Sequence, residues 1–423
     1  MSTNTDASVQ SVASLIEMPQ QAQLIAKIAR DLIAAPSPNP PLDTTEVAGV
    51  AKSILQEVIP DIEVDLFRFG EVTNLVARVR GSNPGRRLIL NGHLDTYPVG
   101  DISKWTVSPY QGDLKDGRIY GRGACDMKGG IAASIVAMKI LAERRDTWSG
   151  ELVMTLGGDE ESMGDLGVRE LIRTVPHAKG DAAIIADAGS PMVTRFGEKG
   201  FIWISVETSG SPAHGAHVHR GVNAIDRLRQ VLDRISELRH IQVVAPITVR
   251  DAIARAKAVS EELSGKGEAD VLSSVTINVG RIEGGTSPNL VPASASFAAD
   301  IRIPVGVTVQ EVESRLLDAI SAIDGVSLKV DRRTEPTFTD PNSEIASCIQ
   351  AAATKVLGAA PALNMRVGAS DARVYRAAHV PTIVYGPTPF NMGGADEYVL
   401  LNELEAVMRV QALAGLDFLS RAQ

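Results

Sequence analysis

Cysteine is scarce in this sequence, which has only Cys125 and Cys348 among its 423 residues. Two cysteines are too few for a disulfide framework, and we expect both to be reduced thiols in a reducing compartment. Long hydrophobic runs are also lacking: no uncharged apolar stretch is long enough to span a bilayer, and the N-terminal segment has no basic region followed by an apolar run. These absences predict a cytoplasmic protein that does not enter a membrane.

Basic residues are not in surplus either. The net charge is -9 at pH 7, and the sequence has no basic cluster or aromatic platform of the kind that binds nucleic acid. We therefore expect no nucleic-acid partner and no anionic-membrane surface. What is present is an ordinary soluble composition, 44% hydrophobic and 22% charged, in a chain long enough for about two domains. A small-molecule substrate is the expected partner.

Apolar periodicity in the first part of the chain alternates between strand and helix. Residues 74–81 and 87–95 have apolar patterns typical of strands, and residues 126–143 have the pattern of a long amphipathic helix before another strand begins at Glu151. This alternation predicts an α/β fold, with a mainly parallel sheet that carries helices on both faces.

The pattern changes after Arg195. The predicted elements there are strands at 199–210, 274–285, 295–304 and 326–333, and amphipathic helices at 223–239 and 307–323. This order predicts a small open sheet with helices on one face, which we interpret as an inserted α+β domain. We place it at residues 196–310, with residues 1–195 and 311–423 forming the other domain. Residues 241–272 remain ambiguous.

His93 and Asp95 stand at the end of a predicted buried strand. Because they are two residues apart, their side chains point to the same side, so that the imidazole could bind a metal while the carboxylate fixes a neighbouring part of the site. A surface pair is the alternative. Asp126 lies in a glycine-flanked turn before a helix, where a helix N-cap would explain it equally well.

Three adjacent carboxylates, Asp159, Glu160 and Glu161, follow another apolar strand. They repel one another, and a nearby cation is the simplest compensation; a solvated loop is the rival interpretation. Alternation would aim Glu160 and Glu161 in different directions, so that one could bind metal while the other accepts a proton from the attacking water. Asp187 also ends an apolar run, where it could join the same rim or serve as a turn residue.

Ordered blocks along nearly the whole chain resemble one family of metallohydrolases. The blocks are GHLDTYPVG, GRGACDMKGG, GDEESMGDLG, AHGAHVHRGVNAI, GGTSPNLVPASASFAADIR, GASDARVY and DEYVLLNEL. The family includes aminoacylase, carboxypeptidase G, acetylornithine deacetylase and succinyl-diaminopimelate desuccinylase. The resemblance implies a catalytic domain that holds divalent metals such as manganese, zinc or cobalt, normally two, and an inserted ferredoxin-like lid domain that forms a homodimer or higher oligomer.

The resemblance also implies roles for the acidic residues. His93 and Asp187 look like ligands of one metal, with Asp126 bridging to a second metal that Glu161 partly holds. Glu160 resembles the general base of the family.

Further roles follow for residues around the ligands and in the lid. Asp95 resembles the acid behind the ligands, and His214 resembles the histidine that reaches into the partner subunit's active site to stabilise an oxyanion. Asn289, Arg302 and Arg373 resemble substrate-binding positions. An arginine can bind a carboxylate through two parallel hydrogen bonds, and a surface ion pair is the alternative for each.

The sequence departs from the family at Gly393. Members normally have a metal-binding histidine four residues before the glutamate that aligns with Glu397, and this chain has glycine there. We favour one well-held metal at His93, Asp126 and Asp187, because one metal with an open position suffices to activate water. Alternatively an oxygen ligand from residue 391 or 396 replaces the histidine, which would favour a harder ion such as manganese.

Hydrolysis of a C–N bond in a small, carboxylate-bearing molecule is the expected function. The enzyme could be an aminohydrolase, like a deviating relative that removes the amino group of nitroanthranilate. It could also be an N-acyl amino acid deacylase, desuccinylase or carboxypeptidase with the ordinary two-metal mechanism. A non-catalytic ligand-binding relative is the alternative from another class, and the retention of Glu160 argues against it.

Overall fold

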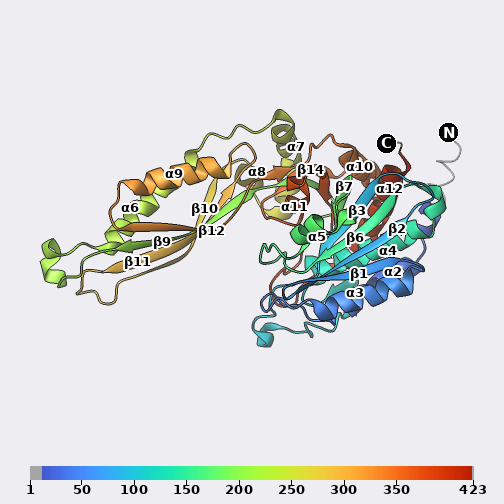
Figure 1. Ribbon diagram of the computed structural model, residues 1–423, viewed down its shortest axis with the longest axis horizontal. Helices are drawn as coiled ribbons and strands as arrows, with labels where there is room; N and C mark the ends of the chain where they lie inside the picture. Colours follow the sequence, from blue (N-terminus) through green and yellow to red (C-terminus); the bar gives the residue numbers. More distant parts are fainter. Residues whose placement is uncertain (1–11, 422–423) are drawn as a thin grey trace. The chain divides into compact units, whose positions relative to one another are not determined.

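The computed structural model describes residues 12–421, which form two compact units (Figure 1). The first unit comprises the residues up to Phe196, Thr339–Asn364 and the chain from Ser370 onwards. The second unit comprises Gly197–Phe338 and Met365–Ala369. Within residues 12–421, no helix combines the length and the apolar character that a membrane crossing requires.

The sheet of the first unit has the strand order β1-β2-β6-β3-β7-β15-β8. Its centre is parallel, from β6 through β3 and β7 to β15, and the outer pairs are antiparallel, so the prediction of a mainly parallel sheet is confirmed. The strands are β1 (Glu63–Phe69), β2 (Val72–Arg80), β3 (Arg87–His93), β6 (Glu151–Gly157), β7 (Ala182–Ile185), β8 (Val193–Glu198) and β15 (Thr382–Val384). Because parallel strands end at one edge of a sheet, the acidic segments after β3, β6 and β7 meet there.

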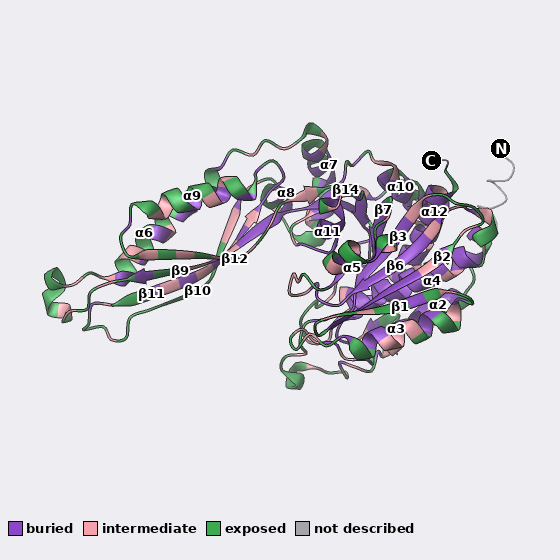
Figure 2. Cartoon of the chain, in the orientation of Figure 1, coloured by how far each residue is buried: buried purple, intermediate pink, exposed green. Residues whose placement is uncertain are grey.

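Helices flank this sheet, and Figure 2 shows its central strands buried beneath them. The helices of the first unit are α2 (Gln20–Ile33), α3 (Thr45–Val58), α4 (Gly129–Ala142), α5 (Val168–Thr174), α10 (Glu344–Leu357), α11 (Ala372–Ala377) and α12 (Leu401–Ser420). The helix predicted after Asp126 is present as α4, but the prediction that it is amphipathic is wrong. All residues of α4 except Lys139 are buried, because α4 packs against α2 and α12 as well as against β3.

A small second sheet in the first unit has the order β16-β5-β4. Its strands are β4 (Leu114–Lys115), β5 (Arg118–Tyr120) and β16 (Tyr398–Leu400). The antiparallel pairing of β16 with β5 joins the chain just after Gly393 to the chain just before Arg122. The two segments therefore lie side by side although they are far apart in the sequence.

The second unit is built on an antiparallel sheet of order β10-β11-β9-β12. The helices α6 and α9 pack on one face of it (Figure 1), and the core between them includes Val206, Leu228, Phe297 and Leu316. The elements are β9 (Gly200–Ser209), α6 (Ala224–Ser236), α7 (Ile247–Ser264), α8 (Glu268–Leu272), β10 (Thr276–Gly284), β11 (Ser294–Ile303), α9 (Val309–Ser321), β12 (Val326–Thr334) and β13 (Thr337–Phe338). The ambiguous segment 241–272 is thus largely helical.

The predicted end of the inserted domain at residue 310 is wrong. The second unit continues to Phe338, because β12 pairs with β9 along the sheet and α9 packs on α6. Its predicted start at residue 196 differs from the observed start, Gly197, by one residue. The unit also takes in Met365–Ala369, a segment that begins within β14 (Ala362–Arg366) and that no sequence pattern indicated.

Candidate metal centre

His93 is the last residue of β3, and its buried imidazole is held at both nitrogens. Nδ1 lies 2.9 Å from the backbone oxygen of Asp95, which orients the ring, while Nε2 lies 3.1 Å from a carboxylate oxygen of Asp126. Burial opposes a charged imidazole, yet the hydrogen bonds to Asp126 and Asp95 hold the pKa of His93 well above its usual value. The ring therefore presents Nε2 toward the acidic residues.

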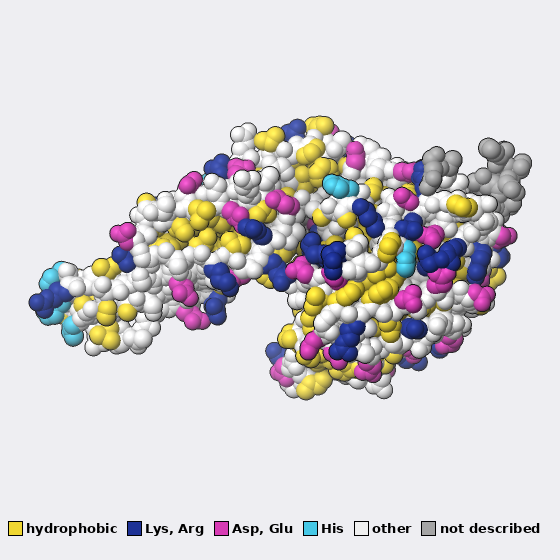
Figure 3. Space-filling model, viewed as in Figure 1, with side chains coloured by type: hydrophobic (Ala, Val, Ile, Leu, Met, Phe, Trp, Pro, Cys, Tyr) yellow, Lys and Arg dark blue, Asp and Glu magenta, His cyan; other side chains and the backbone are white. Residues whose placement is uncertain are grey.

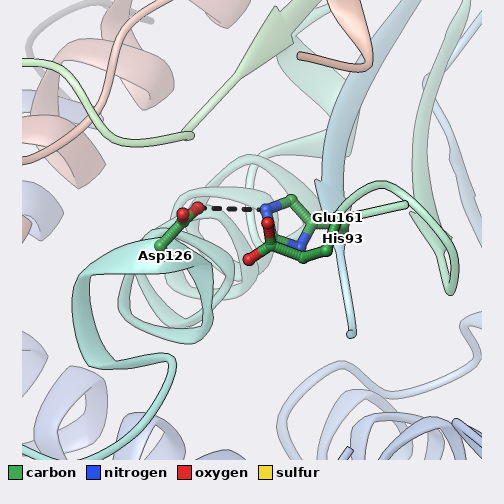
Figure 4. A group of neighbouring side chains, drawn as sticks. All are labelled: His93, Asp126 and Glu161. Carbon is green, nitrogen blue, oxygen red and sulfur yellow. Dashed lines mark hydrogen bonds and ion pairs between the residues drawn. The ribbon is translucent and has the colours of Figure 1, made fainter. Parts of the chain in front are cut away.

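Asp126 and Glu161 complete a compact group with His93 (Figure 4). One ligand atom from each of the three residues lies within 4.8 Å of the others. Asp126 belongs to a short π-helical segment, Ala124–Lys128, and the N-cap of α4 is Lys128. The alternative that Asp126 is an N-cap of this helix is therefore wrong, and its carboxylate faces His93 instead.

The carboxylates of this region are electrostatically strained. Burial raises the pKa of Glu160 to about 8, against the opposing influence of His93 and Arg373. Burial, followed by the charge of Asp126, also raises the pKa of Glu161 far above its ordinary value. Asp371, which the sequence did not point to, has its pKa raised by burial to about 7. Such a buried surplus of carboxylates favours a bound cation.

A divalent metal fits the residues present. The Oε1 atom of Glu161 is buried and finds no hydrogen-bond partner among residues 12–421, which leaves a carboxylate oxygen available as a ligand. One imidazole nitrogen and two carboxylates are ligands that zinc, manganese and cobalt accept. Asp187 follows β7, is buried, and lies near enough for its charge to raise the pKa of Glu160, but it is not part of the three-residue group.

Asp95 organises the loop that carries the acidic residues. Its carboxylate accepts the backbone N–H of Glu160 at 3.1 Å, that of Glu161 at 3.0 Å, and the side-chain amide of Asn39 at 2.9 Å. Asp95 is fully buried, so it is not the surface residue of the alternative interpretation. The structure places it behind the ligands, where it fixes the directions of both glutamates.

Arg373 is buried beside Glu160, so a surface ion pair is excluded for this arginine. Its Nη1 donates to the backbone oxygen of Ser370 at 2.8 Å and lies 3.4 Å from Oε1 of Glu160. The structure thus gives this predicted substrate-binding residue a second contact, with the predicted general base. Asp159 turns away from the group: its carboxylate accepts the backbone N–H of Leu166 at 2.7 Å.

The remaining predicted site residues belong to the second unit. His214 is exposed, and its Nδ1 accepts the backbone N–H of Ala216 at 3.1 Å, which leaves Nε2 to carry the proton of the neutral ring. Figure 3 shows histidine side chains gathered at one end of this unit. Asn289 accepts from the Ser287 hydroxyl, and Arg302 pairs with Asp300 at 2.9 Å while its Nη1 is buried without a partner in the described chain.

In the loop around Gly393, both residues considered above as oxygen ligands make hydrogen bonds. Asp396 uses its carboxylate to accept the backbone N–H of Thr106 at 2.7 Å and the Thr106 hydroxyl at 2.8 Å. The side-chain amide of Asn391 donates to the backbone oxygen of Asp396 at 3.1 Å. Both side chains thus help to hold the loop together, and the idea that residue 391 or 396 replaces the missing histidine stays a prediction.

Four features of this region were missed by sequence reasoning: Asn39, Tyr97, Asp371 and the pair of Arg122 with Glu397. Arg122 and Glu397 are almost fully buried and joined at 2.5 Å. Tyr97 is 42% exposed, and partial burial and the charge of Glu161 raise its pKa. Of these features, only Tyr97 could have been noticed in the sequence, because it continues the two-residue spacing of His93 and Asp95.

Comparisons with known proteins find relatives that match nearly the whole chain. A succinyl-diaminopimelate desuccinylase from Rhodospirillum centenum is 28% identical over 395 residues, which cover 90% of this chain and 95% of the relative. An M20 family metallo-carboxypeptidase from Sulfolobus solfataricus has a similar fold, with a TM-score of 0.76 and 18% identity over 94% of this chain and 99% of that one. A dinuclear metal-binding M20 peptidase from Bacillus subtilis also has a similar fold, with a TM-score of 0.66 and 12% identity. The match covers 95% of this chain and 99% of that one.

The family assignment rests on most of the chain. Residues 89–415 match the family described as Peptidase family M20/M25/M40, a span that includes the group of His93, Asp126 and Glu161 as well as Gly393. The protein is a metal-dependent hydrolase that acts on carbon–nitrogen bonds, and its chain belongs to the M20/M25/M40 peptidase family.

Proposed function

We propose that the protein hydrolyses a C–N bond in a small, carboxylate-bearing substrate, with Glu160 as general base. The position of Glu160 carries this proposal: it is buried next to the group of His93, Asp126 and Glu161, and its backbone is fixed by Asp95. Its pKa, raised to about 8, suits a group that must accept and return a proton near neutral pH. A non-catalytic ligand-binding protein would have no use for such a base.

His93, Asp126 and Glu161 would hold a divalent metal, with Asp187 as a further ligand nearby. Manganese, zinc and cobalt all suit these donors. The metal supplies Lewis-acid activation of water and of the group that is cleaved. Glu160 accepts the proton of the attacking water and returns it to the nitrogen when the C–N bond breaks.

The side chains of the second unit bind the substrate and the developing negative charge. Because Nδ1 of His214 accepts a backbone N–H, Nε2 is the donor, as the stabilisation of an oxyanion requires. We propose that this donor reaches the active site of a partner subunit in a homodimer or higher homo-oligomer. The candidates for contacts with the substrate carboxylate are the side chain of Asn289 and Nη1 of Arg302, which makes no hydrogen bond within residues 12–421.

Two substrate classes satisfy this chemistry. The similarity to a succinyl-diaminopimelate desuccinylase favours an N-acyl amino acid, whose amide carbon is attacked. Gly393 favours the second class, aromatic amines such as nitroanthranilate. Where the second metal lacks a ligand, a nitro group on the ring can take the charge that two metals would otherwise stabilise.

The test compares turnover by the wild-type protein and by Glu160→Gln. The substrates are N-succinyl and N-acetyl amino acids, dipeptides and nitroanthranilate, with release of primary amine or ammonia followed after manganese, zinc or cobalt is added. We expect turnover of one class and a loss of about 10²- to 10⁴-fold in the variant. Metal content and melting temperature should stay near wild type, and full activity in Glu160→Gln would overturn the mechanism.

A further inference from the structure

Asp126 lies on a stretch of backbone that departs from regular helical geometry. It belongs to the π-helical segment Ala124–Lys128, in which Asp126 (φ -132°, ψ 89°) and Met127 (φ -134°, ψ 30°) do not have helical dihedral angles. The Asp126 carboxylate nevertheless points at Nε2 of His93, 3.1 Å away (Figure 4). Because the direction of a side chain depends on its backbone angles, contacts from outside the segment have to hold this backbone in place.

Glu397 supplies such a contact on the N-terminal side of Asp126. Its side chain is 1% exposed, and Oε1 accepts the backbone N–H of Cys125, the residue directly before Asp126, at 3.1 Å. The same oxygen accepts from the Cys125 thiol at 3.4 Å. A buried backbone N–H needs an acceptor, and here a side chain 272 positions away in the sequence provides it.

The other carboxylate oxygen of Glu397 is bound by Arg122. This buried arginine gives Nη1 to Oε2 of Glu397, and Nη2 to the backbone oxygens of Gly393 at 2.9 Å and Gly394 at 3.1 Å. The backbone of Glu397 is held as well, because its oxygen accepts the N–H of Gly121 at 2.9 Å next to the pairing of β5 with β16. Glu397 is therefore fixed both by its backbone and by its second carboxylate oxygen.

We propose that Glu397 is a positioning residue that aims Asp126 at the metal, and that Arg122 orients the Glu397 carboxylate for this task. Burying an ion pair costs desolvation that apolar residues of similar volume would avoid, so stability alone does not account for the pair. The chain after Gly393 thereby acts on the metal through Asp126. This inference rests on the proposed function, in which Asp126 binds the metal.

The experiment measures the zinc affinity of the metal-free, full-length protein by competition with a chromophoric chelator. Zinc is the probe because sites of nitrogen and oxygen donors bind it more tightly than manganese, so weakened variants stay measurable. Glu397→Gln keeps the shape of the side chain and removes its charge. We expect about tenfold weaker binding, since residues that orient ligands have effects of about 10- to 100-fold. The matched control is Glu403→Gln, which should bind like wild type; Glu403 also accepts a backbone N–H, that of Thr388, at 2.6 Å.

A double-mutant cycle separates positioning from a general loosening of the structure. In an Asp126→Ala background, Glu397→Gln should cost no more than about twofold, because no ligand is left there to position. In a Glu161→Gln background, which weakens a different ligand, it should still cost about tenfold. Hydrogen exchange of the Cys125 amide, faster in Glu397→Gln than in Glu403→Gln, reports the lost contact directly.

Equal zinc affinities in Glu397→Gln and Glu403→Gln would overturn the proposal, and so would a tenfold loss that persists in the Asp126→Ala background. If Asp126→Ala binds no measurable zinc, the comparison with Glu403→Gln decides alone. If Glu397→Gln does not fold, Arg122→Lys replaces it throughout, because this variant keeps the charge and loses the planar fork that orients Glu397. His93→Ala tests the site itself: unchanged binding there sinks the proposed metal centre, whereas lost binding with an unaffected Glu397→Gln sinks only the role of Glu397.

Discussion

The two sides of the metal centre are held by different means. On the side of His93, buried side chains hold one another: Asp95 accepts from Asn39 and from two backbone N–H groups, and its backbone oxygen orients the imidazole. On the side of Gly393 the loop is exposed, and Arg122 holds it through backbone oxygens. The first side depends on the identity of several side chains, whereas the second depends on one buried arginine.

This difference explains how the chain can keep one half of the centre and lose a ligand from the other. A change at His93 or Asp95 would leave several buried polar partners without hydrogen bonds, which is costly. At position 393 the backbone oxygen makes the structural contact, so loss of the imidazole leaves the loop attached. The contrast between side-chain and backbone support can be tested on both sides.

The largest effect is expected on the Gly393 side. Arg122→Met leaves Glu397 buried without its partner, so the free energy of unfolding should fall by about 3–5 kcal/mol. Chemical denaturation measures this loss, and hydrogen exchange should show faster opening of residues 391–396 while the amides of Glu160 and Glu161 stay protected.

The matched control for that variant is Arg118→Met. This arginine is exposed on β5 and lies over the ring of Tyr398, so its loss should cost less than about 1 kcal/mol. Equal losses in the two variants would show that the buried pair does not support the loop.

A smaller effect is expected from pH. Burial raises the pKa of Asp371 from 3.8 to about 7, so the metal-free folded state holds a proton that the unfolded state releases above about pH 4. This contribution to stability is complete below pH 4 and is lost as the pH rises through 7. Between pH 5 and 8, the free energy of unfolding of the wild type should fall relative to that of Asp371→Asn by at least about 1.4 kcal/mol, since one pKa unit corresponds to that energy.

Thermal or urea unfolding at several pH values gives this difference. Manganese added at pH 8 should restore stability by neutralising the neighbouring carboxylates. Parallel pH profiles of the wild type and Asp371→Asn would contradict the raised pKa.

The smallest effect is expected on the His93 side. Asn39→Ala removes one of three donors to the Asp95 carboxylate, while the two backbone donors remain. Manganese affinity should fall by no more than about tenfold, the lower end of the range for residues that orient ligands. Titration calorimetry measures it, with Asn83→Ala as a surface control. A loss beyond a hundredfold would mean that this side has no redundancy.

The strand ends that carry the centre could be predicted because parallel strands leave polar residues at one edge. This reasoning singled out His93, Glu160, Glu161 and Asp187, and the structure places three of its candidates, His93, Asp126 and Glu161, together. The contacts of Arg122 with Glu397 and of Arg373 with Glu160 could not be predicted, because they join residues more than 200 positions apart and follow no periodic pattern. The end of the second unit was misplaced at 310 although the helix and the strand that follow had been counted with its small sheet. The pairing of β12 with β9 shows that these elements belong to the unit.

The strand order has a consequence for the synthesis of the protein. β15 pairs with both β7 and β8, yet its residues, Thr382–Val384, are made almost two hundred positions after β7 ends. During synthesis, the apolar edge of β7 therefore stays unpaired until nearly the whole chain has left the ribosome. Such edges invite aggregation, and pairings this distant form slowly. The second unit, whose strands lie between Gly200 and Thr334, can fold during that wait.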